Sequence, residues 1–175
     1  WDTVVAFIIS ANNNMIRIKN SIEAISKNYG DFLGSFEGED FYALPTPDQL
    51  AQVPALELRE KCGVGYRDKY LVETARMVSR GELDLDLLKQ APTAQVMEEI
   101  LTLAGVGPKV AHCILLFGYG RDRSFPVDTW MERTMNDLYG PFKNRREIVE
   151  FGMEKFGDLA GYVQQVLFHG ARKGG

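Results

Sequence analysis

Two glycines separated by a single residue interrupt a helical pattern between Leu103 and Ala111, in the segment LAGVGPKVA. A helix over Val96 to Leu103 is predicted to stop there, and a second helix, from Pro108 to Phe117, to begin at once. Proline suits the first helical position because the amide hydrogen that it lacks has no partner there. The segment therefore predicts two helices joined by a tight hairpin.

Helical periodicity also dominates the rest of the 175-residue chain. Apolar stripes predict a helix that closes at Gly30, and others over Tyr66 to Val78, Thr129 to Tyr139 and Leu159 to Ala171. The segment from Phe36 to Pro47 reads as a loop, and no alternating pattern indicates a β-strand. We predict an all-α chain, whose length allows either one core or two small lobes flanking a cleft.

Composition narrows the classes of function. No run approaches the 18 or so apolar residues of a membrane span and no signal peptide is seen, so we expect no membrane association. The only two cysteines, Cys62 and Cys113, suit a reducing compartment and cannot supply the four ligands of an iron–sulfur cluster. The formal net charge of −4 argues against a nucleic-acid partner, although binding depends on where cations lie rather than on their sum.

The hairpin is a candidate phosphate-binding site. Its glycines keep the surface bare, and the second helix points unpaired amide hydrogens outward, which suits an anion. The candidate residues are Gly105, Val106 and Gly107. A plain turn between packed helices is the alternative interpretation.

Lys109 lies in the first turn of the second helix, just after Pro108. The helix dipole disfavours a cation there by about 0.3–1 kcal/mol. A neutral amine is the form that attacks a sugar carbon and forms a Schiff base. Lys109 is therefore a candidate nucleophile, and a surface lysine at a helix end is the alternative.

Asp128 follows nineteen residues later in the segment FPVDTW and is the candidate partner carboxylate. Thr129 and Glu132 have the spacing of a capping box for the helix that begins there. Asp128 has a structural alternative, because it could simply help to cap that helix.

The GVGPK hairpin and the downstream PVD resemble the helix–hairpin–helix DNA glycosylase superfamily. The lysine is typical of its bifunctional glycosylase/AP-lyase branch, and the similarity to 8-oxoguanine DNA glycosylases runs from Trp1 to Arg172. That family's N-terminal β-rich domain has no counterpart in the sequence. On this resemblance we expect one lobe from residues 1–17 with 109–175 and another from 18–108.

The resemblance implies a role for each motif residue. Lys109 falls on the nucleophile and Asp128 on the catalytic carboxylate. The segments FIISANNNMIR and GVGYR are similar to those that contact the orphan base and wedge into the vacated stack, which points to Asn12, Arg17, Tyr66 and Arg67. The base pocket would be formed by Cys113, Phe117, Gln164 and Phe168. Taken singly, Cys113 and Phe168 also suit a core, and Arg67 a solvated charge.

The resemblance also implies a monovalent cation, K⁺ or Na⁺, held by backbone carbonyls of the hairpin, and no required cofactor. The carbonyls are those of Leu101, Leu103 and Val106. Two positions depart from the family pattern: Trp130 stands where a phosphate-contacting histidine is usual, and Phe117 where a methionine is common.

These observations predict a monomeric base-excision repair enzyme. It would remove 8-oxoguanine opposite cytosine from double-stranded DNA through a lysine Schiff base, in the nucleoid of a bacterium or the nucleus of a eukaryote. Two alternatives stay open: a glycosylase of the same fold for another damaged base, and a non-catalytic helix–hairpin–helix module that only binds DNA.

Overall fold

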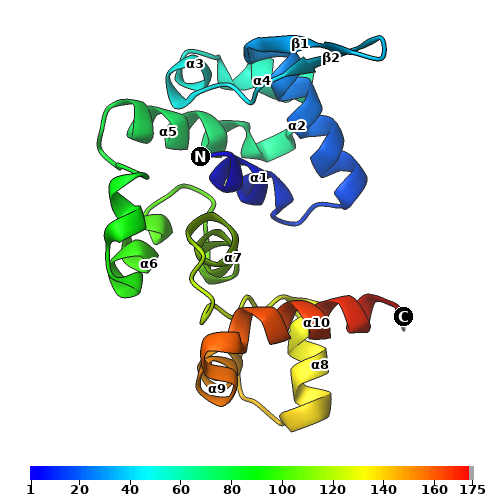
Figure 1. The fold of residues 1–175 in the computed structure, drawn as a ribbon, viewed down its shortest axis with the longest axis vertical. Helices are drawn as coiled ribbons and strands as arrows, with labels where there is room; N and C mark the ends of the chain where they lie inside the picture. The colour runs from blue at the N-terminus through cyan, green and yellow to red at the C-terminus, as the bar shows by residue number, and fades with distance from the viewer. Residues whose placement is uncertain (174–175) are drawn as a thin grey trace. The chain divides into compact units, whose positions relative to one another are not determined.

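The computed structural model describes residues 1–173, with side chains as far as Gly170 (Figure 1). Helices dominate, as predicted for an all-α chain, and the strands form one small antiparallel hairpin. In chain order the elements are α1 (Asp2–Ser10), α2 (Met15–Tyr29), β1 (Phe32–Phe36), β2 (Glu39–Tyr42), α3 (Pro47–Ala51), α4 (Ala55–Cys62), η1 (Gly65–Arg67), α5 (Asp68–Ser79), η2 (Leu87–Gln90), α6 (Thr93–Leu101), α7 (Pro108–Tyr119), α8 (Thr129–Tyr139), α9 (Arg145–Phe156), η3 (Gly157–Leu159) and α10 (Ala160–Lys173). Across the described helices, none is both long and apolar enough to cross a bilayer.

The chain divides into two compact units, Trp1–Val106 and Gly107–Gly175. Contacts group α1 with α2 and α5 in the first unit. The sequence-based division joined residues 1–17 to 109–175 instead, and that larger arrangement stays a prediction.

The core of the first unit is centred on α1, α4 and α5. Helix α1 is apolar on most of its surface, as expected of a helix enclosed by others. Helix α5 packs along α3, and α4 packs against α2. The deeply buried side chains of this core include Val5, Ile8, Ile9, Ile25, Leu50, Leu58, Val64, Leu71, Ala75, Val96 and Ile100.

The hairpin of β1 and β2 was not predicted, and the expectation of a loop over Phe36 to Pro47 is wrong for its first half. Glu37 and Gly38 have φ of 51° and 85°, and Phe36 pairs with Glu39. Positive φ at both central residues defines the tight turn whose twist matches paired strands. Apolar and polar residues do not alternate here because both faces of the hairpin are largely exposed.

Helix α2 ends before Gly30 as predicted, but for a different reason. Gly30 has an extended backbone, with φ −93°, rather than a left-handed one. A Cβ at this position would lie 1.8 Å from the carbonyl oxygen of Ala43. A close approach of two backbone segments, rather than backbone freedom, therefore requires the glycine.

The second unit has a core of its own, built from α8, α9 and α10 and the segment before α8. Its buried centre consists of Phe125, Val127, Met131, Met135, Ile148 and Ala160. Aromatic and aliphatic side chains surround it, including Phe151, Phe156, Leu167 and Phe168. Helices α8 and α10 are in extensive contact. Residues 129–139 form a helix with the bounds that the sequence predicts.

Helix α9 was missed by the sequence analysis. Asn144 begins it by accepting a hydrogen bond from the Glu147 amide, and Arg146 pairs with Glu150 one turn on. Gly152 interrupts the apolar stripe, which hid the helical pattern. A Cβ at Gly152 would lie 2.7 Å from the Phe125 ring, so only a glycine leaves room for that ring.

The hairpin turn follows α6 as predicted. Helix α6 ends at Leu101, the Val106 amide donates to the Leu103 carbonyl over 3.1 Å, and α7 begins at Pro108. Gly105 has φ of 77°, and a Cβ there would lie 2.4 Å from the Tyr70 ring. Within the first unit, the turn therefore lies directly on an aromatic side chain.

We predict that Gly105→Ala destabilises the protein by roughly 2–4 kcal/mol, since it adds left-handed strain to a clash with Tyr70. Gly107→Ala is the matched control, because φ is −98° and a Cβ there meets nothing within 4 Å. Urea unfolding of both variants measures the difference. Equal losses would contradict the close contact with Tyr70.

Candidate active site

Lys109 occupies the second position of α7 and is half-buried. Gly107 is the N-cap and has no side chain to satisfy the free amides of the first turn. The start of α7 therefore combines amide donors with an amine on one short stretch of backbone. This is the local geometry that the sequence predicts for the hairpin and its lysine.

Cys113 lies one turn after Lys109 and is only 5% exposed. Burial raises the pKa of its thiol, while the Lys109 amine lowers it through charge and a side-chain hydrogen bond. The carboxylate of Asp128 raises the pKa of the same thiol. The charges of Lys109 and Asp128 thus act on one thiol in opposite directions, although nineteen residues separate them in the chain. Both belong to the second unit.

Asp128 also caps α8. Its Oδ1 accepts a hydrogen bond from the Met131 amide at 2.9 Å. The capping box predicted for Thr129 and Glu132 is wrong, because the N-cap is Asp128 itself. Both side chains accept hydrogen bonds from Arg145 instead. Its Nε donates to the Glu132 carboxylate at 2.8 Å, and its Nη2 donates to the Thr129 hydroxyl at 3.1 Å.

Gln164 is 3% exposed, and its amide group is engaged inside the protein. Nε2 donates to the Pro126 carbonyl at 2.9 Å, and Oε1 accepts from Gln165 at 2.6 Å. An amide has two donor hydrogens and two acceptor lone pairs, so one of each is left for a base edge. The bond to Pro126 also fixes α10 to the segment that leads into Asp128.

The aromatic members of the predicted pocket differ in exposure. Phe168 lies on α10 one turn after Gln164, is half-buried and packs against the core of the second unit. Phe117, on the last turn of α7, is 52% exposed. Trp130, at the position of the usual histidine, is 44% exposed, and the Arg133 guanidinium carbon lies 6.0 Å from its ring centre.

Similarity to known proteins identifies the family of this chain. Residues 5–158 match the model of the HhH-GPD superfamily base excision DNA repair proteins. The chain belongs to the HhH-GPD superfamily. A probable N-glycosylase/DNA lyase of Methanothermobacter thermautotrophicus is 37% identical over 194 residues, which cover 100% of this chain and 62% of that protein. An N-glycosylase/DNA lyase of Saccharomyces cerevisiae is 29% identical, over 96% of this chain and 54% of the yeast protein.

The fold of this chain is also similar to a solved structure of an HhH-GPD relative. The Clostridium acetobutylicum 8-oxoguanine glycosylase/lyase, in complex with double-stranded DNA containing cytosine opposite 8-oxoguanine, superposes with a TM-score of 0.93 at 41% identity. The match covers 98% of this chain and 59% of that one. The chain thus spans less than two thirds of the length of these relatives.

The orphan-base residues implied by the HhH-GPD resemblance lie on two turns of the first unit. Asn12, with a positive φ of 48°, and Arg17 are both exposed near the junction of α1 and α2. Tyr66 is 50% exposed on η1 and lies edge-on to Tyr70. Arg67, expected as a solvated charge or a base contact, is instead 7% exposed and bonded to backbone carbonyls.

His112 was not considered in the sequence analysis, although it lies between Lys109 and Cys113 on α7. It is 9% exposed, and its Nδ1 has no hydrogen-bond partner among the described residues. Burial lowers the pKa of His112 to about 4. Its place in an otherwise apolar run, VAHCILL, was the available sequence signal. A neutral, buried imidazole here is part of the packing of α7.

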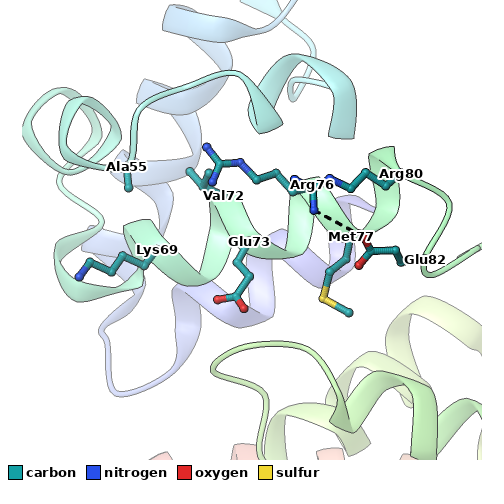
Figure 2. Close-up of a pocket in the computed structure, with 8 residues that line it drawn as sticks. All are labelled: Ala55, Lys69, Val72, Glu73, Arg76, Met77, Arg80 and Glu82. Atoms are coloured by element: carbon teal, nitrogen blue, oxygen red, sulfur yellow. Dashed lines mark hydrogen bonds and ion pairs between the residues drawn. The ribbon is translucent and has the colours of Figure 1, made fainter.

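A cavity of about 500 Å³ opens beside α5 in the first unit (Figure 2). Charged side chains of both signs line it, and Arg80 and Glu82 are paired at 3.5 Å. None of the predicted site residues lines this cavity.

The buried imidazole gives a pH prediction. The pKa of His112 falls from 6.5 in the unfolded chain to about 4 in the folded one, so the unfolded state binds the extra proton between these values. Its contribution to stability is complete above pH 6.5 and is lost as the pH falls to about 4, by roughly 3 kcal/mol at most.

Unfolding free energies measured from pH 4 to pH 7 check this prediction. His112→Gln should flatten the pH dependence, whereas His169→Gln, at the exposed second histidine, should leave it unchanged. Identical slopes for wild type and His112→Gln would refute the assignment.

Proposed function

We propose that the chain carries out the chemistry of a bifunctional DNA glycosylase and AP lyase that removes 8-oxoguanine opposite cytosine from double-stranded DNA. The observation that carries the proposal is that Lys109, one turn before Cys113 on α7, hydrogen-bonds to its buried thiol, and that the charge of Asp128 acts on the same thiol. The names of the yeast and archaeal relatives as N-glycosylase/DNA lyases, and of the clostridial one as an 8-oxoguanine glycosylase/lyase, support it.

Lys109 is the proposed nucleophile. Its amine attacks C1′ of the flipped nucleotide, the bond from C1′ to the base breaks, and the base leaves with a proton. Loss of the amine proton and opening of the sugar give a Schiff base, which permits β-elimination of the 3′ phosphate. The amine lies in the first turn of α7, whose N-cap Gly107 offers the backbone amides no side-chain partner.

Asp128 is the proposed electrostatic partner. Positive charge develops on the sugar as the base departs, and a fixed carboxylate stabilises that charge without having to reorganise. The bond from Asp128 Oδ1 to the Met131 amide supports the assignment, because it fixes one oxygen of the group. The capping role and the catalytic role are therefore compatible.

The flipped base would be held by the pocket residues that the resemblance implies. Extruding a base costs a few kcal/mol, which stacking and edge hydrogen bonds must offset. The remaining donor and acceptor of Gln164 and the ring of Phe168 suit those tasks.

Charge distribution supports DNA as the partner despite the net charge of −4. Residues 107–175 contain ten Lys and Arg against eight Asp and Glu, while residues 1–106 contain ten against sixteen. The excess of acidic residues therefore lies in the first unit, and the unit that carries Lys109 is slightly basic. Backbone amides at the start of α7 would add affinity for a phosphate, and this contribution is not counted in the formal net charge.

The hairpin carbonyls are also suitable for a monovalent cation beside that phosphate. Leu101 ends α6, where helix carbonyls lack intrahelical partners, and Leu103 uses one lone pair for the Val106 amide. Carbonyl oxygens are hard ligands of the kind that K⁺ or Na⁺ prefers. Bound there, the ion would offset phosphate charge. We propose that the protein acts as a monomer in the nucleoid or the nucleus.

Borohydride trapping tests the nucleophile. We expect wild-type protein to form a covalent adduct with a duplex containing 8-oxoguanine opposite cytosine, and Lys109→Gln to lower adduct formation by about a thousandfold or more. Lys143→Gln, at an exposed lysine of the same unit, should trap like the wild type. An adduct with Lys109→Gln would disprove the assignment.

The same experiment separates the alternatives. Adducts only with other damaged bases in the duplex would support a glycosylase of the same fold with a different substrate. DNA binding without base release from any lesion would support a non-catalytic binding module.

Two substitutions separate the roles of Asp128. Asn is as good an N-cap as Asp, so Asp128→Asn should keep stability within about 0.5 kcal/mol while base release falls by roughly 100-fold or more. Asp128→Ala should lose about 1 kcal/mol of stability as well. Asn144→Ala, which removes the N-cap of α9, is the control: stability should fall without loss of base release. Full base release by Asp128→Asn would show that the carboxylate is structural only.

A further inference from the structure

The hairpin of β1 and β2 exposes apolar side chains that the packing of the first unit does not use. Leu33 and Phe36 on β1 are 68% and 67% exposed, and Phe41 on β2 is 48% exposed. The strands pair Gly34 with Phe41, and residues two apart on a strand point to the same face. Phe36 and Phe41 therefore share one face of the hairpin. Apolar side chains gathered on an exposed face are typical of an interaction surface.

The same hairpin has a strand edge with no neighbouring strand. In the described part of the chain, the sheet consists of β1 and β2 alone. Strand β2 contacts α2, and β1 forms the outer edge of the hairpin (Figure 1). Backbone N–H and C=O groups along such an edge can pair with an extended segment of another chain. The fold therefore offers backbone partners beside the exposed side chains of Leu33 and Phe36.

Carboxylates surround these apolar side chains, and no cation neutralises them. The four exposed acidic residues of the hairpin are Asp31, Glu37, Glu39 and Asp40. None of them forms an ion pair with any residue that the structure describes. Residues 28–58 contain six Asp and Glu and no Lys or Arg, whereas the other residues contain twenty Lys and Arg against eighteen Asp and Glu. The negative charge of the chain is therefore concentrated in this segment.

This charge determines which kind of partner fits. The phosphates of DNA and of anionic lipids have the same sign as the hairpin, which repels them. A second copy bound by two-fold symmetry would bring the same carboxylates against one another. Positive groups are the complement of this surface, and complementary charge steers and orients a protein partner. A basic segment with apolar side chains fits both the charge and the exposed rings.

We propose that the β-hairpin surface, formed by Leu33, Phe36 and Phe41 with the carboxylates around them, docks an extended segment of another protein in which Lys or Arg alternates with apolar residues. Successive side chains of an added strand point to opposite faces, so its apolar side chains can pack together on Phe36 and Phe41. Its basic side chains offset the nearby carboxylates. None of these residues belongs to the candidate active site, so the inference goes beyond the proposed function and does not rest on it.

A defined peptide tests this docking surface. The probe is a fluorescein-labelled octapeptide of alternating lysine and valine, which is titrated with the whole chain at low salt and followed by fluorescence polarisation. We expect saturable binding that Leu33→Ser weakens about fivefold through loss of apolar contact, and Glu39→Lys about fivefold through reversal of charge. Added salt should weaken the binding further, because the charges are exposed.

Two matched substitutions in the first unit control for general effects. Leu87→Ser removes a leucine that is 72% exposed on η2, and Glu98→Lys reverses the charge of an exposed glutamate on α6. Both variants should bind the probe like the wild type. Losses as large as those of Leu33→Ser and Glu39→Lys would overturn the proposal, and so would the absence of saturable binding by the wild type.

A second peptide separates docking from charge attraction alone. An octapeptide of alternating lysine and serine has the same charge without the apolar side chains, and we expect it to bind about fivefold more weakly. Equal affinity for the two peptides would overturn the proposal. Because no DNA is present, a protein that binds the probe but releases no 8-oxoguanine would refute only the proposed function.

Two further measurements test the other occupants of the β-hairpin surface. A dimer in sedimentation that Leu33→Ser abolishes would assign the surface to a second copy of the chain. Binding to phosphatidylcholine vesicles that Leu33→Ser abolishes would assign it to a lipid surface. We expect neither, and either result would overturn the proposal.

Discussion

A single hydrogen bond, from the Met131 amide to the Asp128 carboxylate, connects the packing of the second unit to its proposed chemistry. Met131 is fully buried in the core of that unit, so the position of α8 is fixed by apolar contacts. The cap therefore fixes the carboxylate, whose charge acts on the thiol of Cys113, to which Lys109 hydrogen-bonds. Gln164 supports the same segment from α10 through the Pro126 carbonyl. The contacts that pack the second unit therefore also hold the candidate active-site residues in place.

The sequence predicted most where local chemistry decides the outcome. The bounds of α8 and the glycine turn before α7 follow from glycines and apolar periodicity. The stop at Gly30 was predicted too, although a contact with the distant Ala43 backbone requires that glycine. The grouping of Lys109 with Asp128 came from family resemblance, and the electrostatics of Cys113 agree with it. Membership of the HhH-GPD superfamily confirms the predicted fold.

What the sequence could not predict depends on contacts between distant residues. Nothing in the local pattern shows that the Arg67 donors are used by carbonyls 55 and 56 positions away. The β-hairpin was hidden because its two faces are both exposed, and α9 because Gly152 replaces an apolar side chain where the Phe125 ring needs room. The capping box was assigned one residue late because Arg145, from another helix, takes the side chains that would have formed it.

The protonated state of Cys113 has a consequence for the conditions in which such a protein works. Thiolates, not thiols, react with peroxides, and each oxidation step adds oxygen and then charge to sulfur. Burial keeps this sulfur in the thiol form at neutral pH and leaves only 5% of the residue accessible. The oxidants that damage guanine in DNA would therefore attack this cysteine slowly. With the proposed function, the chemical stress that oxidises guanine would therefore leave this part of the candidate active site intact.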